Sequence, residues 1–162
     1  MTTRFGRIVS PALHVYHRAA KLARTGRWPL TIGVRIIVRD EAAQVLLVRH
    51  TYAPGWHFPG GAVDKREAAV DAAVRELREE ALIEAIAPPR LVGIYLSLTQ
   101  KKSDHILFYE AGAWRPTQGK ARVLEIAETG FFPAYALPEG TTGGTRRRLA
   151  ELAGDAPQST TW

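Results

Sequence analysis

The clearest pattern of apolar and polar positions lies between Ala68 and Ala81, where the chain reads AAVDAAVRELREEA without proline or glycine. Alanine, leucine, glutamate and arginine are strong helix formers, so the sequence predicts a helix over Ala68 to Ala81. Its larger apolar residues recur at spacings of four, three and four, which keeps them on one helical face. That face, which we expect to pack on a core, contains Val70, Val74, Leu77 and Ala81.

Apolar, β-branched stretches on both sides of this helix predict strands. LTIGVRIIVR from Leu30 to Arg39 and QVLLVRH from Gln44 to His50 are separated by four residues, and we expect them to form a hairpin. After the helix, Arg90 to Gln100 and Asp104 to Trp114 predict two further strands joined by a polar turn. Another strand is expected near Ala121 to Ile126.

The last part of the chain predicts a turn region, one helix and a tail. FFPAYALPEG, residues 131–140, is rich in turn residues. Thr141 or Thr142 is suited to cap a final helix, TRRRLAEL, which is expected to end at Gly154. The remaining residues, 155–162, are expected to form a flexible tail.

Basic residues mark the first and last predicted helices. A helix from about Pro11 to Thr25 combines a short apolar stripe with histidines, lysine and arginines. It is suited to an anionic membrane surface or nucleic acid, but the short stripe favours packing on its own domain or on a second subunit, as in a homodimer. In the final helix, Arg146 to Arg148 are expected to form a solvated face.

The order of these elements predicts the fold class. Strands interrupted by one long helix and flanked by terminal helices indicate an α/β/α sandwich with a mixed β-sheet. The chain of 162 residues shows no internal repeat or linker, so we expect one domain over residues 1–154. No stretch is long and apolar enough to predict a membrane span.

Composition narrows the chemistry. The chain contains no cysteine, which excludes disulfides, thiolate metal ligands and cysteine nucleophiles and is compatible with the expected cytoplasmic location. The formal net charge of +6 favours ligands that carry phosphate.

Three carboxylates gather on one patch of the predicted central helix. Glu76, Glu79 and Glu80 stand at positions i, i+3 and i+4, where like charges repel one another. Such a patch is either a solvated acidic face or a cation site. Carboxylate oxygens suit Mg²⁺ or Mn²⁺.

The stretch PGGAVDKREAAVDAAVRELREEALI, from Pro59 to Ile83, resembles the Nudix box. The box reads Gly-x5-Glu-x7-Arg-Glu-U-x-Glu-Glu-x-Gly-U, where U is an aliphatic residue. Eight of its nine fixed positions match here, namely Gly61, Glu67, Arg75, Glu76, Leu77, Glu79, Glu80 and Ile83. Leu82 replaces the second glycine, so the helix end requires either a strained, left-handed leucine or a different exit.

The resemblance implies a Nudix fold and a Mg²⁺-dependent pyrophosphohydrolase. Water would attack phosphorus in a nucleotide, or in a nucleoside diphosphate linked to another group. By position in the box, Glu76, Glu79 and Glu80 and the carbonyl of Gly60 correspond to metal ligands, and the three glutamates with Arg75 form the catalytic set. Glu67 corresponds to a residue that braces the motif through Arg75.

Family members often take a further metal carboxylate from outside the box. Glu125 is the leading residue for this role and Glu128 the second, while Asp104 and Glu110 are further alternatives. For each of the four, the better-supported interpretation is a solvated acid without a role at the site, because exposed carboxylates often have none.

The substrate needs cations and a surface for its remaining group. Arg35 and Arg49 interrupt apolar strands and either bind phosphate or face solvent, and Gly61 is expected to contact the substrate. Among the aromatic residues ahead of the box, Trp56 either stacks on a nucleobase or packs in the core, whereas Phe58 is expected in the core.

Two other functions remain as alternatives. One is hydrolysis at the 5′ end of RNA, for which the chain shows no RNA-binding motif. The other is a nucleotide-sensing Nudix-like domain without catalysis. The three mutually repelling glutamates argue against the latter, because a site without metal has no need of them.

Overall fold

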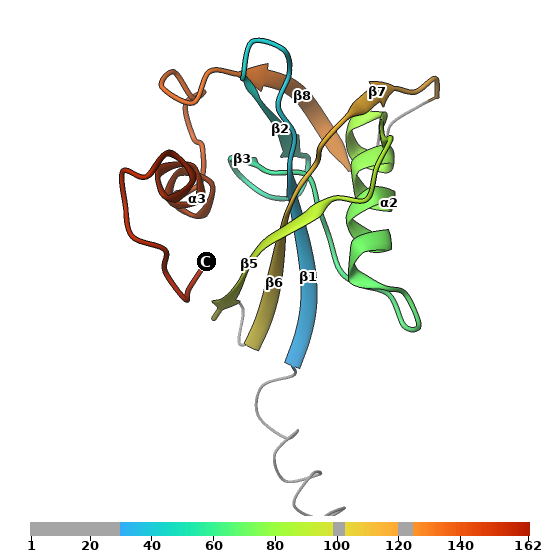
Figure 1. Ribbon diagram of the computed structural model, residues 1–162, viewed down its shortest axis with the longest axis horizontal. Helices are drawn as coiled ribbons and strands as arrows, with labels where there is room; N and C mark the ends of the chain where they lie inside the picture. Colours follow the sequence, from blue (N-terminus) through green and yellow to red (C-terminus); the bar gives the residue numbers. More distant parts are fainter. Residues whose placement is uncertain (1–29, 99–102, 120–124) are drawn as a thin grey trace, which may run out of the picture.

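The computed structural model describes residues 30–98, 103–119 and 125–162 (Figure 1). The helix expected over Pro11 to Thr25 therefore lies outside the described residues. The described elements are β1 (Leu30–Ile37), β2 (Val45–His50), β3 (Trp56–His57), α2 (Ala69–Ala81), β4 (Ile83–Ala85), β5 (Arg90–Ser97), β6 (Ser103–Glu110), β7 (Trp114–Pro116), β8 (Ile126–Phe132) and α3 (Gly143–Ala153).

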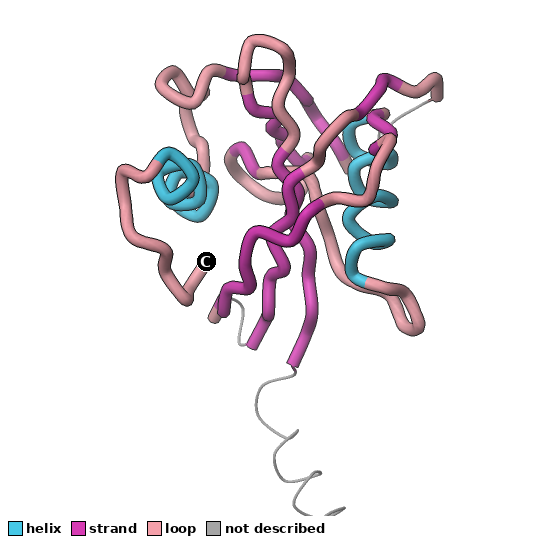
Figure 2. Tube along the Cα trace, viewed as in Figure 1, coloured by secondary structure: helices cyan, strands magenta, loops and turns pink. Residues whose placement is uncertain are grey.

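The strands form three small sheets between two helices. β1, β6 and β5 make one sheet, in which β1 runs parallel to β6 and β5 runs antiparallel to it. β3, β2 and β8 form an antiparallel sheet, and β4 pairs with β7. α2 and α3 lie on opposite sides of the strands (Figures 1 and 2). The predicted α/β/α architecture with mixed strand directions is confirmed.

The first two strands form where the sequence predicts them, but they do not form the expected hairpin. They are joined by a short turn with one bridge between Arg39 and Val45 and a hydrogen bond of 3.0 Å from Leu46 N to Val38 O. Beyond this turn, β1 pairs with β6 and β2 with β8. β2 is apolar on both faces over Val45 to Val48 and occupies the middle of its sheet, whereas β1 alternates apolar residues with Thr31, Gly33 and Arg35 and lies at the edge of its sheet.

The final strand lies later in the chain than predicted. β8 begins at Ile126 and continues through Phe132, so it includes residues that the sequence assigned to a turn-rich closure. Residues 121–124 of the expected strand are outside the described part. The ring of Phe132 packs in an edge-on arrangement on Trp56, with ring centroids 4.9 Å apart, and this burial explains the longer strand.

The core has one half on each side of the strands. The half under α2 includes Val34, Ile36, Ala72, Ala73 and Leu77, and the half under α3 includes Ile37, Leu47, Phe58, Phe108 and Leu149. Ala72, Ala73 and the predicted contact residue Leu77 are fully buried, whereas the other predicted contact residues, Val70, Val74 and Ala81, are only partly buried. Small side chains bring the helix close to the sheet, and this rotates its buried face away from the larger valines.

The end of α2 resolves the question raised by Leu82. This residue has φ 55° and ψ 40°, the left-handed conformation, and its amide donates to Arg78 O at 3.1 Å. Leucine therefore closes the helix in the geometry that glycine normally adopts.

α3 begins and ends as predicted, but its surroundings differ. Thr142 caps it through a hydrogen bond from Thr145 N, and Gly154 ends it in the left-handed conformation. Arg148, expected on a solvated face, is fully buried. Its guanidinium lies 3.8 Å from the ring centroid of Tyr95 and donates to Glu151 at 2.5 Å.

The expected flexible tail, residues 155–162, instead packs against the sheet. Trp162 N donates to Leu96 O and Leu96 N donates to Thr160 O, each at 2.9 Å. The Trp162 ring lies 5.7 Å from that of Phe108. Arg148 also donates to Thr161 O at 3.1 Å, so the buried guanidinium fastens the tail to α3. No helix among the described ranges has the length and apolar character needed to cross a membrane.

Candidate active site

The residues just before α2 run alongside β1. Val34 N donates to Gly61 O at 2.8 Å, and Ile36 N donates to Pro59 O at 2.9 Å. Gly60 has φ 144°, and a Cβ there would lie 2.1 Å from Val34 O. Only glycine fits this close approach, which brings the Gly60–Gly61 backbone beneath the carboxylates of α2.

Two of the three predicted glutamates lie against this backbone. Glu76 and Glu80 are buried, whereas the Glu79 side chain is 30% exposed. Glu80 Oε2 accepts a hydrogen bond of 2.9 Å from Gly60 N, and a Cβ on Gly61 would meet Glu76 Oε1 at 2.4 Å. The glycine pair thus makes room for both carboxylates.

Arg75 links the acidic residues to one another. Its guanidinium holds both oxygens of Glu67, at 2.7 and 3.0 Å, and also donates to Glu76 at 2.6 Å and Glu79 at 3.1 Å. The hydrogen bond from Arg75 is the main cause that lowers the pKa of Glu67 to about 2, and a bond from Asp64 N acts in the same direction. Glu67 raises the pKa of Arg75 in turn, so both groups remain charged.

A cavity of about 280 Å³ opens over the glycine pair. Its lining residues include Tyr52, Gly60, Gly61, Arg75, Glu76, Glu80 and Glu125. Glu125 is therefore the one of the four proposed outer carboxylates that reaches this cavity. Its carbonyl accepts from Thr51 N at 2.8 Å, which connects the residue just before β8 to the loop after β2.

The other three acids make contacts elsewhere. Glu128 pairs with Arg49 at 2.7 Å, Asp104 accepts from Thr31 at 2.9 Å, and Glu110 pairs with Arg90 at 2.5 Å. None of them lines the cavity of Glu76 and Glu80.

The donor set of this cavity fits a hard divalent cation. Carboxylates on one helix and backbone carbonyls at the glycine pair are oxygen ligands, and the absence of a Cβ at Gly61 leaves Glu76 in contact with the backbone. Within residues 30–98, 103–119 and 125–162, no three acidic or histidine side chains are already gathered as a metal-binding group. The carboxylates of Glu76 and Glu79 accept hydrogen bonds from Arg75 instead, so a cation would have to compete with the Arg75 guanidinium for them.

His50 is a neighbour of the site that the sequence interpretation did not include. Its side chain is 7% exposed, and Nε2 lies 3.7 Å from Glu80 Oε1. Burial, followed by the charges of Arg35 and His57, lowers the pKa of His50 to about 4, so the ring is neutral near pH 7. The sequence did contain a signal for His50: it is a histidine at the end of an apolar strand, directly before the loop that leads into the box.

The two strand arginines have different surroundings. Arg49 is paired with Glu128 and lies 5.9 Å from the Trp56 ring centroid. Arg35 donates to Val34 O at 3.1 Å, and within the described part of the chain no carboxylate forms an ion pair with it. Its charge helps to lower the pKa of both His50 and His57, which places it at the histidine side of the site.

The aromatic residues ahead of the box differ in how far they are buried. Trp56 is 9% exposed and Phe58 is fully buried, so both belong to the core, as predicted for Phe58. Trp56 therefore does not present a free ring face for a nucleobase. Tyr52 is 71% exposed and lines the cavity of the carboxylates.

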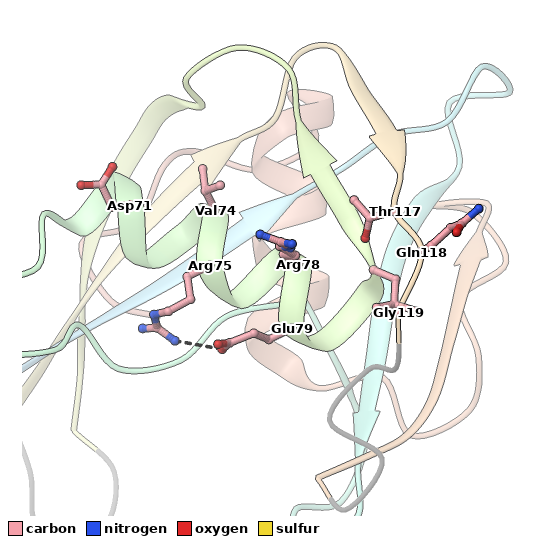
Figure 3. Close-up of a pocket in the computed structure, with 9 residues that line it drawn as sticks. Asp71, Val74, Arg75, Arg78, Glu79, Thr117, Gln118 and Gly119 are labelled. Carbon is pink, nitrogen blue, oxygen red and sulfur yellow. Dashed lines mark hydrogen bonds and ion pairs between the residues drawn. The ribbon is translucent and has the colours of Figure 1, made fainter.

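A second cavity, of about 540 Å³, lies along the outer face of α2 and shares Arg75 with the first. Figure 3 shows Arg75 and Glu79 joined at its edge, with Arg78 and Val74 on the same helix and Thr117 across from them. Neither Gly60 nor Glu80 borders it. Of the three predicted glutamates, Glu76 and Glu80 border the smaller cavity, whereas Glu79 borders the larger one.

Comparison with known proteins agrees with this geometry. A family model described as the NUDIX domain matches residues 29–151. A Bacillus subtilis (strain 168) protein named "Putative 8-oxo-dGTP diphosphatase" is 38% identical over 126 residues, covering 78% of this chain and 82% of that protein. An RNA pyrophosphohydrolase of Pseudomonas aeruginosa is 44% identical over 53 residues, 33% of each chain.

Solved structures show the same fold. A MutT Nudix hydrolase from Burkholderia pseudomallei has a TM-score of 0.66 and 23% identity, covering 76% of this chain and 98% of that chain. A MutT protein from Methanosarcina mazei Go1 has a TM-score of 0.67 and 20% identity, covering 81% and 98%. At such identities the likeness establishes the fold alone.

These findings define the class of protein. The chain belongs to the Nudix family. It is a Nudix hydrolase, as the box predicted.

Proposed function

We propose that this Nudix hydrolase is a nucleotide pyrophosphohydrolase that requires a divalent cation, Mg²⁺ or alternatively Mn²⁺. One observation carries the proposal: the carboxylates of Glu76 and Glu80 lie against the Gly60–Gly61 backbone in a single cavity. Burying two carboxylates at this point lowers the stability of the fold unless a cation or hydrogen bonds compensate their charge.

The residues that would hold the cation at the 280 Å³ cavity are Glu76, Glu80 and the carbonyl of Gly60, with Glu125 at its border. Glu79, proposed as a further ligand, borders the 540 Å³ cavity and would have to turn toward the ion. A divalent ion bound there supplies positive charge for the diphosphate and lowers the pKa of a bound water. Gly60 N keeps Glu80 oriented through its hydrogen bond. Glu67 keeps Arg75 beside the cavity when Glu76 and Glu79 turn toward a cation.

Arg35 and Arg75 are the cations proposed to neutralise the phosphate oxygens. Arg35 has no carboxylate partner within the described ranges, and a guanidinium binds phosphate through paired hydrogen bonds. Arg49 is bound to Glu128, so the proposal that it contacts substrate now requires that this exposed pair open. Gly61 remains a proposed substrate contact because it lines the cavity.

The substrate class proposed first is a nucleoside triphosphate. The name of the Bacillus subtilis relative makes an oxidised purine deoxynucleotide the first compound to test. The 5′ triphosphate end of RNA is the second candidate, supported by relatives that match over one third of the chain and by the net charge of +6. Glu76 and Glu80, buried at the same cavity, argue against the non-catalytic alternative.

The test is phosphate and pyrophosphate release from a substrate panel with Mg²⁺ or Mn²⁺. The panel contains 8-oxo-dGTP, dGTP, sugar nucleotides, ADP-ribose, dinucleoside polyphosphates and triphosphorylated RNA, each with wild type and Glu80→Gln. Turnover of a nucleoside triphosphate that is lost in Glu80→Gln supports the proposal. Turnover confined to RNA supports the second candidate, and nucleotide binding without turnover supports the regulatory alternative.

A further inference from the structure

We propose that the base of the nucleotide substrate stacks on the ring of Tyr52, in a cavity formed by residues 49–55 beside the carboxylates. This inference rests on the proposed function, because it assumes that the ligand of the site is a nucleotide. It assigns the aromatic contact to Tyr52 in place of Trp56.

Tyr52 stands between two cavities. One is the 280 Å³ cavity that contains Glu76 and Glu80, and the other has a volume of about 340 Å³ and is lined by residues 49–55. Tyr52 lines both of them. A ligand with its diphosphate in the first cavity therefore has the second within reach, with the Tyr52 ring at the junction.

The ring is supported from behind and remains exposed. The His50 ring packs on it with centroids 5.0 Å apart and an angle of 37°, and His50 is itself buried beside Glu80. With 71% of Tyr52 exposed, most of its surface is open to a ligand. An exposed aromatic face offers stacking energy to any nucleobase.

The loop that holds Tyr52 is anchored at several points. Thr51 N donates to Glu125 O at 2.8 Å, and His57 Nε2 lies 3.1 Å from Pro54 O. Trp56 N donates to Gly140 O at 3.3 Å. The backbone of the loop is thus held in place before a ligand arrives, which reduces the entropy lost on binding.

The phenol of Tyr52 is close enough to the acidic residues of the site to interact with their charges. Partial desolvation raises the pKa of Tyr52, and the charges of Glu80 and Glu125 raise it further. The phenol is therefore neutral at physiological pH and close to the carboxylates. A base on this ring places its phosphates toward Glu76 and Glu80.

The experiment compares Tyr52→Ala, Tyr52→Phe and Tyr135→Ala with wild type. Tyr135 is 94% exposed and borders neither cavity, so Tyr135→Ala is the matched control. We measure KM and kcat for the nucleotide that wild type hydrolyses, the Kd of its α,β-imido analogue by calorimetry, and the inhibition constant of inorganic tripolyphosphate, which has no base.

Stacking predicts that Tyr52→Ala raises KM and Kd by about 10- to 100-fold, with a smaller change in kcat. Tyr52→Phe and Tyr135→Ala stay within about threefold of wild type, and the inhibition constant of tripolyphosphate is unchanged in all variants. The inference is overturned if Tyr52→Ala binds the analogue normally, if Tyr52→Phe is impaired as much as Tyr52→Ala, or if tripolyphosphate inhibition weakens in parallel. If wild type hydrolyses no nucleotide, the proposed function fails, and analogue binding still decides the role of Tyr52.

Discussion

The backbone amide of Gly60 donates a 2.9 Å hydrogen bond to Oε2 of Glu80, although the two residues are twenty positions apart. This bond connects the loop beside β1 with the last turn of α2. It orients one carboxylate toward the cavity that also contains Glu76. The fold and the proposed chemistry therefore share this contact.

Glu80→Gln is expected to fold normally and to lose activity. The glutamine oxygen still accepts from Gly60 N, but the charge that holds a divalent cation is removed. We expect kcat to fall by roughly 10²- to 10³-fold, the scale typical of removing one electrostatic contact. Steady-state assays with Mg²⁺ and a melting curve check this, with Glu41→Gln, an exposed turn residue, as control. An unchanged kcat would remove Glu80 from the cation site.

Alanine substitutions at Gly60 and Gly61 are expected to differ in their effects, with the first mainly lowering stability and the second mainly lowering activity. In Gly60→Ala the new Cβ would lie 2.1 Å from Val34 O, a backbone atom, so we expect a loss above about 3 kcal/mol in the free energy of unfolding. In Gly61→Ala the clash is with the flexible end of Glu76, so activity should fall more than stability.

Urea denaturation and turnover measure the two effects. Gly112→Ala is the control, since its Cβ would meet nothing within 4 Å. Equal destabilisation by Gly60→Ala and Gly61→Ala would contradict the close approach of Gly60 to β1.

The ion pair between Glu67 and Arg75 predicts a pH dependence of stability. The pKa of Glu67 is about 2 in the folded protein and near 4.5 ordinarily, so its contribution is complete above pH 4.5 and is lost as the pH falls toward 2. The stability difference between wild type and Glu67→Gln should therefore be constant above about pH 5 and shrink in acid. Denaturation series from pH 7 to pH 2.5 test this, and a difference independent of pH would contradict it.

Leu82→Gly is expected to be neutral or slightly stabilising. Glycine removes the cost of a left-handed leucine, roughly 1 kcal/mol, but it also removes a partly buried side chain and adds freedom to the unfolded chain. Leu82→Ala loses the side chain and keeps the strain, so it should be less stable than Leu82→Gly by about 1 kcal/mol. Chemical denaturation of both variants decides this, and the reverse order would show that packing outweighs strain.

Arg148→Ala is expected to destabilise the protein by about 3–5 kcal/mol, because it leaves Glu151 buried without its partner. Arg146→Ala, on the exposed side of the same helix, should cost less than about 1 kcal/mol. The unfolding free energies of the two variants provide the comparison. Similar values would mean that the tail is not held through Arg148.

Local sequence was sufficient to predict α2, α3 and the group of carboxylates on α2. The positions of Glu76, Glu79 and Glu80 on one helix follow from helical geometry, and the Thr142 and Gly154 boundaries of α3 follow from capping preferences. The two conformations open to Leu82 were also evident from the missing glycine. Each of these features depends on residues within a few positions of one another.

Contacts between distant residues were not evident in the same way. The sequence does not show whether Arg35 or Arg49 has an acidic partner. Arg49 has one because β8 pairs with β2 and places Glu128 beside it. The burial of Trp56 depends in the same way on Phe132, and the exposure of Tyr52 on how the loop after β2 is anchored.

The family, the central helix and the carboxylates on it could be predicted from the sequence, because they follow from short-range periodicity and a contiguous motif. Strand pairing, the burial of Arg148, the packing of residues 155–162, and which acid and aromatic residue border the cavity became evident from the three-dimensional structure. Apolar strands do not encode their partners locally, and an exposed or buried side chain is distinguished only by what the rest of the chain places next to it.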